Sequence, residues 1–126
     1  MTINFISTDK APAAIGPYSQ GTKAGNLIFT SGQLPIVPET GELIKDDIKK
    51  ATKQSLSNVL SVVEAAGGKL TDIAKVVIFI KNMEDFPKVN EVYEDFFKDH
   101  KPARSCVEVS RLPKDANIEI EAIAIV

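Results

Sequence analysis

The residues best suited to chemistry lie in the segment PARSCVEVS at 102–110. If this segment is a strand, alternation places Arg104 and Cys106 on one face and Ser105 and Val107 on the other. We expect the valines to face a helix-covered core, so Arg104 is predicted to point to the opposite, uncovered face of the sheet. A guanidinium removed from water needs an anion, and its planar fork fits a small carboxylate. Arg104 therefore either binds a carboxylate ligand or pairs with a glutamate of another strand.

Two such glutamates, Glu119 and Glu121, alternate with apolar residues in the tail IEIEAIAIV at 118–126. Shielding a carboxyl from water raises its pKa and prepares it as a general acid or base near neutral pH. The alternatives are that both glutamates guard an edge strand against aggregation, or that one of them neutralises Arg104. Cys106 is open to two interpretations as well, a nucleophile or a small buried hydrophobic residue.

Further candidates for a ligand pocket come from a helix and two turns. Asn90 falls within the aromatic stripe of a predicted helix, where its amide either ties the helix to a loop or reaches a ligand. The glycine-containing turns AIGPY at 14–18 and TSGQ at 30–33 carry Tyr18, Ser31 and Gly32, and glycine lets the backbone approach a ligand. Neither turn has the spacing of a phosphate-binding loop.

The elements that position these residues can be predicted from periodicity. Apolar residues at helical spacing predict an amphipathic helix between Asp46 and Gly68, with Asp46 or Asp47 as N-cap and Gly67 at its end. A second helix follows Asp85 and ends before Pro102. Strands are expected at about 3–7, 18–24, 27–33, 73–81, 104–110 and 118–126. Crossovers through the helices favour parallel pairing, whereas the early strands and the last pair can form hairpins.

The predicted sheet is apolar on both faces, which has a consequence for assembly. In the strand 73–81, Val76, Ile78 and Ile80 face one way, and Val77 and Phe79 face the other. Two helices can cover one face only, and a large exposed apolar face usually marks an interface. We therefore expect a homo-oligomer built through the uncovered face. The alternative is a twisted sheet that is half covered by its own loops.

Composition excludes several classes of function. The chain has 126 residues, 15 basic and 17 acidic residues and a net charge of −2, so we expect a single domain over 1–126 and no nucleic-acid partner. One cysteine and one histidine leave little for a metal site or a Ser/His/Asp triad, and turn signals predict that His100 lies on the surface. No apolar run approaches the roughly 18 residues of a membrane span, and a single cysteine fits the cytoplasm.

Several ordered segments together resemble the RidA/YjgF family over essentially the whole chain. They are APAAIGPYSQG at 11–21, FTSGQLP at 29–35, KVNEVYEDFF at 88–97, PARSCVEVSRLP at 102–113 and the tail IEIEAIAIV. The resemblance implies a chorismate-mutase-like α+β fold, a mixed six-stranded sheet with two helices packed on one face. It also implies a homotrimer with three pockets between subunits.

The activity that this resemblance implies is hydrolysis of 2-iminobutanoate or 2-iminopropanoate, which pyridoxal-phosphate enzymes release, without a cofactor or metal. The pocket residues it implies are Tyr18, Ser31, Gly32, Asn90, Arg104, Cys106 and Glu119. Arg104 would hold the substrate carboxylate, Glu119 with the Cys106 region would position a water molecule, and Tyr18 would close over the ligand. Pro87 and the short connection 100–102 depart from the expected pattern, which leaves substrate breadth open.

Two other functions compete with the deaminase. One is a non-catalytic trimer that binds small carboxylate metabolites and regulates a partner. The other is the translation inhibitor or endoribonuclease role attached to the family, which the net charge of −2 and the lack of an evident catalytic histidine disfavour.

Overall fold

The computed structural model describes residues 2–126 as one α+β unit. The elements follow in the order β1 (Ile3–Ile6), β2 (Gly21–Ala24), β3 (Leu27–Thr30), α1 (Ile48–Ala65), η1 (Leu70–Asp72), β4 (Ile73–Ile80), η2 (Met83–Asp85), α2 (Phe86–Phe97), β5 (Ala103–Glu108), η3 (Pro113–Asp115) and β6 (Ile118–Ile125), where η marks a 3-10 turn. The predicted α+β class with two helices and six strands is confirmed. The three 3-10 turns were not predicted.

The six strands form one mixed sheet in the order β1-β2-β3-β6-β4-β5. β4 and β5 are parallel neighbours, and α2 connects them. β6 lies between β3 and β4 and is antiparallel to both. The predicted hairpin between the last two strands is therefore wrong. A central position suits β6 because Ile118, Ile120 and Ala124 are fully buried, whereas β5 is more exposed and occupies the edge.

Local signals define the ends of α1 as predicted. The Asp47 side chain accepts hydrogen bonds from the backbone N–H groups of Lys49 and Lys50, which satisfies two unpaired donors of the first turn. Gly67 follows the helix with φ +93, a left-handed conformation that costs glycine little. β2 begins at Gly21 rather than at residue 18. A Cβ added at Gly21 would lie 2.6 Å from Cγ1 of Val62 in α1. The sheet and α1 therefore pack closely at this point.

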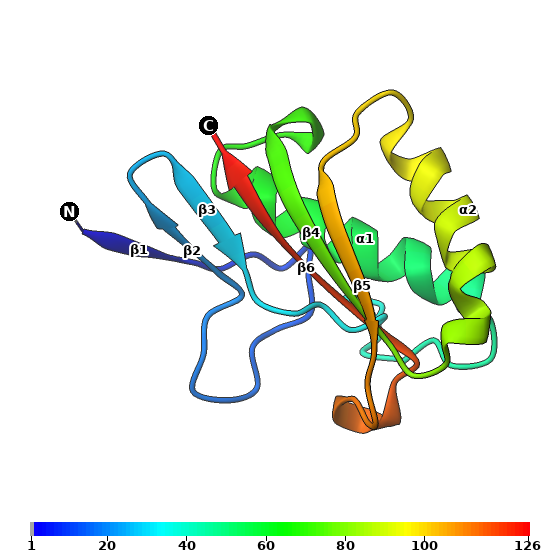
Figure 1. Cartoon of the computed structure of the whole chain (residues 1–126). Coiled ribbons are helices and arrows are strands. Elements are labelled where there is room, and N and C mark those ends of the chain that lie inside the picture. Colours follow the sequence, from blue (N-terminus) through cyan, green and yellow to red (C-terminus); the bar gives the residue numbers. More distant parts are fainter. Residues whose placement is uncertain (1) are drawn as a thin grey trace.

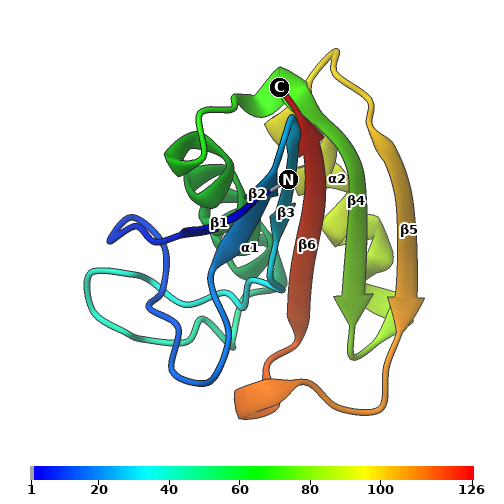
Figure 2. The ribbon, with the colours of Figure 1, turned by 90° about the vertical axis from the view of Figure 1, so that its left-hand side faces the viewer.

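Both helices lie on the same side of the sheet (Figures 1 and 2). The core fills the space between the helices and the sheet. It includes Val76, Ile78 and Ile80 from β4, with Leu56 and Val59 from α1. Burying these side chains provides the main stabilisation of the domain, at about 25 cal/mol per Å² of apolar surface.

The other side of the sheet has no helix, and we call it the open face. It carries apolar side chains from five strands: Phe29, Val77, Phe79, Val107 and Ile123 from β3, β4, β5 and β6, with Ile3 and Phe5 exposed on β1. Phe29 and Val107 remain 38% and 43% exposed, respectively. This confirms that the sheet is apolar on both faces. Among residues 2–126, no helix combines the length and apolar character needed to cross a membrane.

Candidate active site

A cavity of about 640 Å³ opens where β3 ends and β6 begins. Four predicted site residues line it: Tyr18, Ser31, Gly32 and Glu119. Its remaining walls come from the segment before β2, the loop 34–41 and the turn η3. This volume lies within the usual range for a small-molecule site, about 300–1,000 Å³.

A buried glutamine, Gln20, builds the wall that carries Tyr18. It is 4% exposed, and its side-chain amide N–H groups donate to the carbonyl oxygens of Thr8, Ala11 and Pro12, while its Oε1 accepts from the N–H of Thr8. Our sequence reasoning did not single out Gln20. A glutamine at the entry to a buried strand was the available signal, since a buried amide must find partners.

Ser31 fixes the same wall from the other side. Its Oγ donates to the carbonyl of Ser19 at 2.6 Å, and its N–H donates to the carbonyl of Gln20 at 2.9 Å. The hydroxyl oxygen retains lone pairs that can accept a further hydrogen bond. Tyr18, next to Ser19, is 51% exposed at the cavity and is free to cover a ligand.

Gly32 lies against the carboxylate of Glu119. A Cβ at Gly32 would be 2.6 Å from Cδ of Glu119 and 2.9 Å from each of its carboxylate oxygens. Real Cβ atoms do not approach other atoms so closely, so only glycine allows Glu119 its observed position.

Glu119 is a carboxyl whose pKa is raised. Burial in the protein is the larger cause, and the neighbouring negative charge of Glu121 adds to it. Both effects disfavour the ionised form. Glu119 is half-buried, and a carboxyl with a raised pKa on a cavity wall is suited to proton transfer.

A second group of predicted residues surrounds Arg104 at the β5 edge of the sheet. Its guanidinium donates from Nη1 to Oδ1 of Asn90 at 2.7 Å and lies 4.6 Å from the ring centroid of Tyr93 and 5.3 Å from that of Phe86. These three α2 residues have spacings of four and three, which place them on one stripe of the helix. Hydrogen bonding and cation–π contacts therefore orient the guanidinium. Phe86 and Tyr93 belong to the predicted aromatic stripe, but they were not predicted as part of the site.

The predicted face of Arg104 is wrong. Arg104 pairs with Val76 and Cys106 with Ile78, and both β4 residues are buried under the helices. Directly paired residues share a face, so Arg104 and Cys106 lie on the helix side and Val107 lies on the open face. The valines were expected on the helix side because they are apolar. The aromatic stripe of α2 instead accommodates the flat guanidinium.

The thiol and the histidine have structural surroundings. Cys106 packs against the core, and burial raises its pKa, an effect that the nearby Arg104 charge opposes. A raised pKa disfavours the thiolate, so the structure supports the hydrophobic interpretation of Cys106. His100 is half-buried rather than on the surface, and its Nε2 lies 2.7 Å from the carbonyl oxygen of Ile73. Within 2–126 no three His, Cys, Asp or Glu side chains gather as metal ligands.

The predicted site is therefore divided into two groups within one chain. Glu119 pairs with Phe79 on the open face, whereas Arg104 pairs with Val76 on the helix face, and β4 separates their strands. Tyr18, Ser31 and Gly32 accompany Glu119, and Asn90 and Cys106 accompany Arg104.

The fold and this site define an α+β domain with a small-molecule cavity, and comparison with known proteins gives its family. Residues 8–126 match the family model described as Endoribonuclease L-PSP. The 2-iminobutanoate/2-iminopropanoate deaminase of Escherichia coli is 57% identical over 123 residues, 95% of each chain. A RutC family protein of Pyrococcus abyssi is 55% identical, covering 98% of each chain. The crystal structure of E. coli TdcF with bound serine superposes with a TM-score of 0.94 at 49% identity, covering 98% of each chain.

This chain belongs to the RidA/YjgF family, as the matches cover nearly its full length.

Proposed function

We propose that this protein hydrolyses 2-imino acids, including 2-iminobutanoate and 2-iminopropanoate, to 2-keto acids and ammonia. The observation that carries the proposal is the state of Arg104. Its guanidinium is held by two rings and a neutral amide, and it makes no ion pair with any carboxylate in residues 2–126. A partly buried guanidinium without an acid partner is suited to a ligand carboxylate. The name of the E. coli relative supports the same activity.

The chemistry needs three tasks from the protein. Arg104 binds the substrate carboxylate through its remaining N–H donors. Glu119 accepts a proton from a water molecule whose oxygen forms a bond to the imine carbon. As the C=N bond becomes a single bond, the nitrogen takes this proton from Glu119, which gives a neutral amino alcohol and restores the Glu119 carboxylate. The C–N bond then breaks as the hydroxyl proton passes to the nitrogen, so that ammonia leaves and the carbon retains the oxygen as a ketone.

The two groups of residues must meet for this reaction, and a homotrimer with pockets between subunits can bring them together. The open face offers an apolar surface for a second copy, since Phe29 and Val107 are exposed there. In such an assembly the edge strand β5 of one subunit, with Arg104 and Asn90, lies beside the Glu119 cavity of the next. We place the reaction in the cytoplasm, which fits the single free cysteine.

A coupled assay tests the activity. Threonine dehydratase generates 2-iminobutanoate in a buffer where spontaneous hydrolysis is slow, and keto-acid and ammonia release are followed with and without this protein. We expect faster release with the wild-type protein and almost none with Arg104→Lys, because lysine keeps the charge but loses the planar two-point grip. A protein that binds 2-ketobutyrate without accelerating hydrolysis would instead be the non-catalytic binder.

Mixing two inactive variants tests where the pocket lies. Arg104→Lys and Glu119→Gln subunits are denatured together and reassembled at equal amounts. If each pocket takes Arg104 from one subunit and Glu119 from its neighbour, about one quarter of the pockets regain both residues, so about one quarter of wild-type activity returns. Failure to regain activity in assembled mixed trimers would contradict a shared pocket.

The endoribonuclease alternative has less support from the structure. The only histidine is bonded to a backbone carbonyl outside the Glu119 cavity, and the net charge is −2. RNA cleavage by nuclease-free protein that Arg104→Lys abolishes would reverse this judgement.

A further inference from the structure

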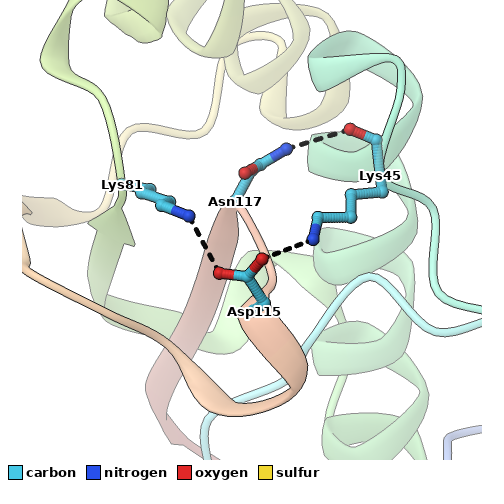
Figure 3. A network of polar contacts seen from close by, with 4 residues as sticks. All are labelled: Lys45, Lys81, Asp115 and Asn117. Atoms are coloured by element: carbon cyan, nitrogen blue, oxygen red, sulfur yellow. Dashed lines mark hydrogen bonds and ion pairs between the residues drawn. The ribbon is translucent and has the colours of Figure 1, made fainter.

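An ion-pair network joins three distant segments at the outer edge of the Glu119 cavity. The Asp115 carboxylate accepts from Nζ of Lys45 at 2.6 Å and from Nζ of Lys81 at 2.8 Å (Figure 3). Asn117 adds a side-chain hydrogen bond to the carbonyl of Lys45 at 2.9 Å and accepts at its own carbonyl from the N–H of Lys81 at 3.0 Å. The loop before α1, the end of β4 and the turn η3 are thereby connected.

The turn η3 needs such support because its backbone is unfavourable. Lys114 and Asp115 have φ values of 57 and 56, the left-handed region that residues with a Cβ rarely adopt. Two consecutive residues in this region persist only where their surroundings hold them. The ion pairs of Lys45 and Lys81 with Asp115 stabilise this conformation.

The same network joins two walls of the cavity. Pro113 and Lys114 of η3 form one wall, and Ile36, Pro38 and Gly41 of the loop 34–41 form another. Asn58 of α1 anchors the start of this loop through the carbonyls of Leu34 and Ile36. The chain that follows the loop is held at Lys45, whose Nζ donates to the Asp115 carboxylate.

We propose that Asp115 is a positioning residue that holds these two cavity walls together, so that salt weakens substrate affinity by screening its ion pairs. The inference rests on the proposed deaminase function for its kinetic consequence. The side chains of Lys45, Lys81 and Asp115 are 44%, 41% and 55% exposed, so counter-ions reach them. The two lysines also lower the pKa of Asp115 to about 2, so the carboxylate stays ionised at physiological pH and salt is the effective variable.

The kinetic test compares Asp115→Asn with wild-type protein in the imine assay at low and high salt. Asparagine tolerates the left-handed backbone but removes the charge. We expect KM to rise about fivefold with kcat within about twofold. The salt dependence of KM should become weaker than in wild-type protein, and the part that remains comes from screening of the substrate carboxylate and Arg104. Glu91→Gln is the matched control, because it removes the Lys49–Glu91 pair of 3.0 Å between the two helices, whose side chains are 46% and 63% exposed. This control should leave KM and its salt response unchanged.

Hydrogen exchange tests the positioning independently of activity. Asp115→Asn should accelerate amide exchange in residues 35–45 and 113–117 but not in β4, and Lys81→Met should do the same to a smaller extent. Faster exchange in a protein without deaminase activity would support the positioning role and reject the proposed reaction. Unchanged exchange in both variants, or a salt dependence of KM in Asp115→Asn as steep as in wild-type protein, would overturn the proposal.

Discussion

Gly32→Ala separates the function of Glu119 from its contribution to stability. The added Cβ would lie 2.6 Å from Cδ of Glu119, and ordinary contact begins at 3.4 Å, so the carboxylate must move by about 0.8 Å. The atom that must move is the end of a flexible side chain and not backbone. The Glu119 side chain can therefore rotate away, so the substitution changes the position of the carboxylate more than the stability of the fold.

The expected loss of stability is small. An off-rotamer Glu119 costs about 0.5–1.5 kcal/mol, while replacing glycine by alanine lowers the entropy of the unfolded chain and returns about 0.4–1 kcal/mol. The net change in the free energy of unfolding stays below about 1 kcal/mol, or a shift of at most about 5 °C in Tm. If Glu119 positions the attacking water, a displacement of this size should lower kcat by about 100-fold.

Thermal unfolding measures the Tm and the coupled imine assay measures kcat, both on the same preparation. The double variant Gly32→Ala with Glu119→Ala is the control, because the added methyl group then has no carboxylate to displace. Its free energy of unfolding should exceed that of Glu119→Ala by the about 0.4–1 kcal/mol that the glycine replacement returns. A folded Gly32→Ala protein with wild-type turnover would refute the inference that Glu119 works from its observed position.

Three other changes test the remaining parts of the argument. Burial raises the pKa of Glu119, so the folded state favours the protonated carboxyl. The contribution of Glu119 to stability is therefore complete below its unfolded pKa near 4.5 and is lost as pH rises through the folded pKa. Glu119→Gln should therefore reduce the loss of stability between pH 4 and 8, seen in urea midpoints, and lower turnover by about 100-fold, whereas Glu121→Gln should change turnover little. Ile123→Asp should dissociate or unfold the assembly in sedimentation, because it places a charge on the open face. The Tyr93 hydroxyl is buried without a partner among residues 2–126, so Tyr93→Phe should not reduce Tm, and it should keep KM because the ring under Arg104 remains.

Local periodicity was sufficient to predict the two helices and the six strands of this fold, but not its three 3-10 turns. The helical spacing and the Asp47 cap are properties of neighbouring residues, and they located α1 to within a few residues. The alternation in β4 also showed correctly that both faces of the sheet are apolar. The order of the strands was less accessible, because insertion of β6 between β3 and β4 depends on contacts between residues far apart in the chain.

The site was predicted as a set of residues but not as an arrangement. Strand alternation pointed to Arg104 and to the pair Glu119 and Glu121, and resemblance to a family selected Glu119, whereas only the strand register shows that Arg104 and Glu119 lie on opposite faces. The rule that valines face the core failed on β5, because that edge strand offers Val107 to the open face. Gln20 and Asp115 escaped notice because single polar residues in loops acquire their roles from distant partners.

The division of the site also connects the open face with Arg104. Over residues 2–126 the chain exposes apolar side chains on one sheet face and gives the positioned Arg104 guanidinium no acid partner, so it has two unmet requirements. A second copy on the open face would satisfy the first, and a substrate carboxylate would satisfy the second. If the same assembly brings Arg104 beside Glu119, the substrate binds only where two subunits meet. Catalysis and assembly would then depend on the same contacts, so a substitution that separates the subunits should abolish turnover even with every pocket residue intact.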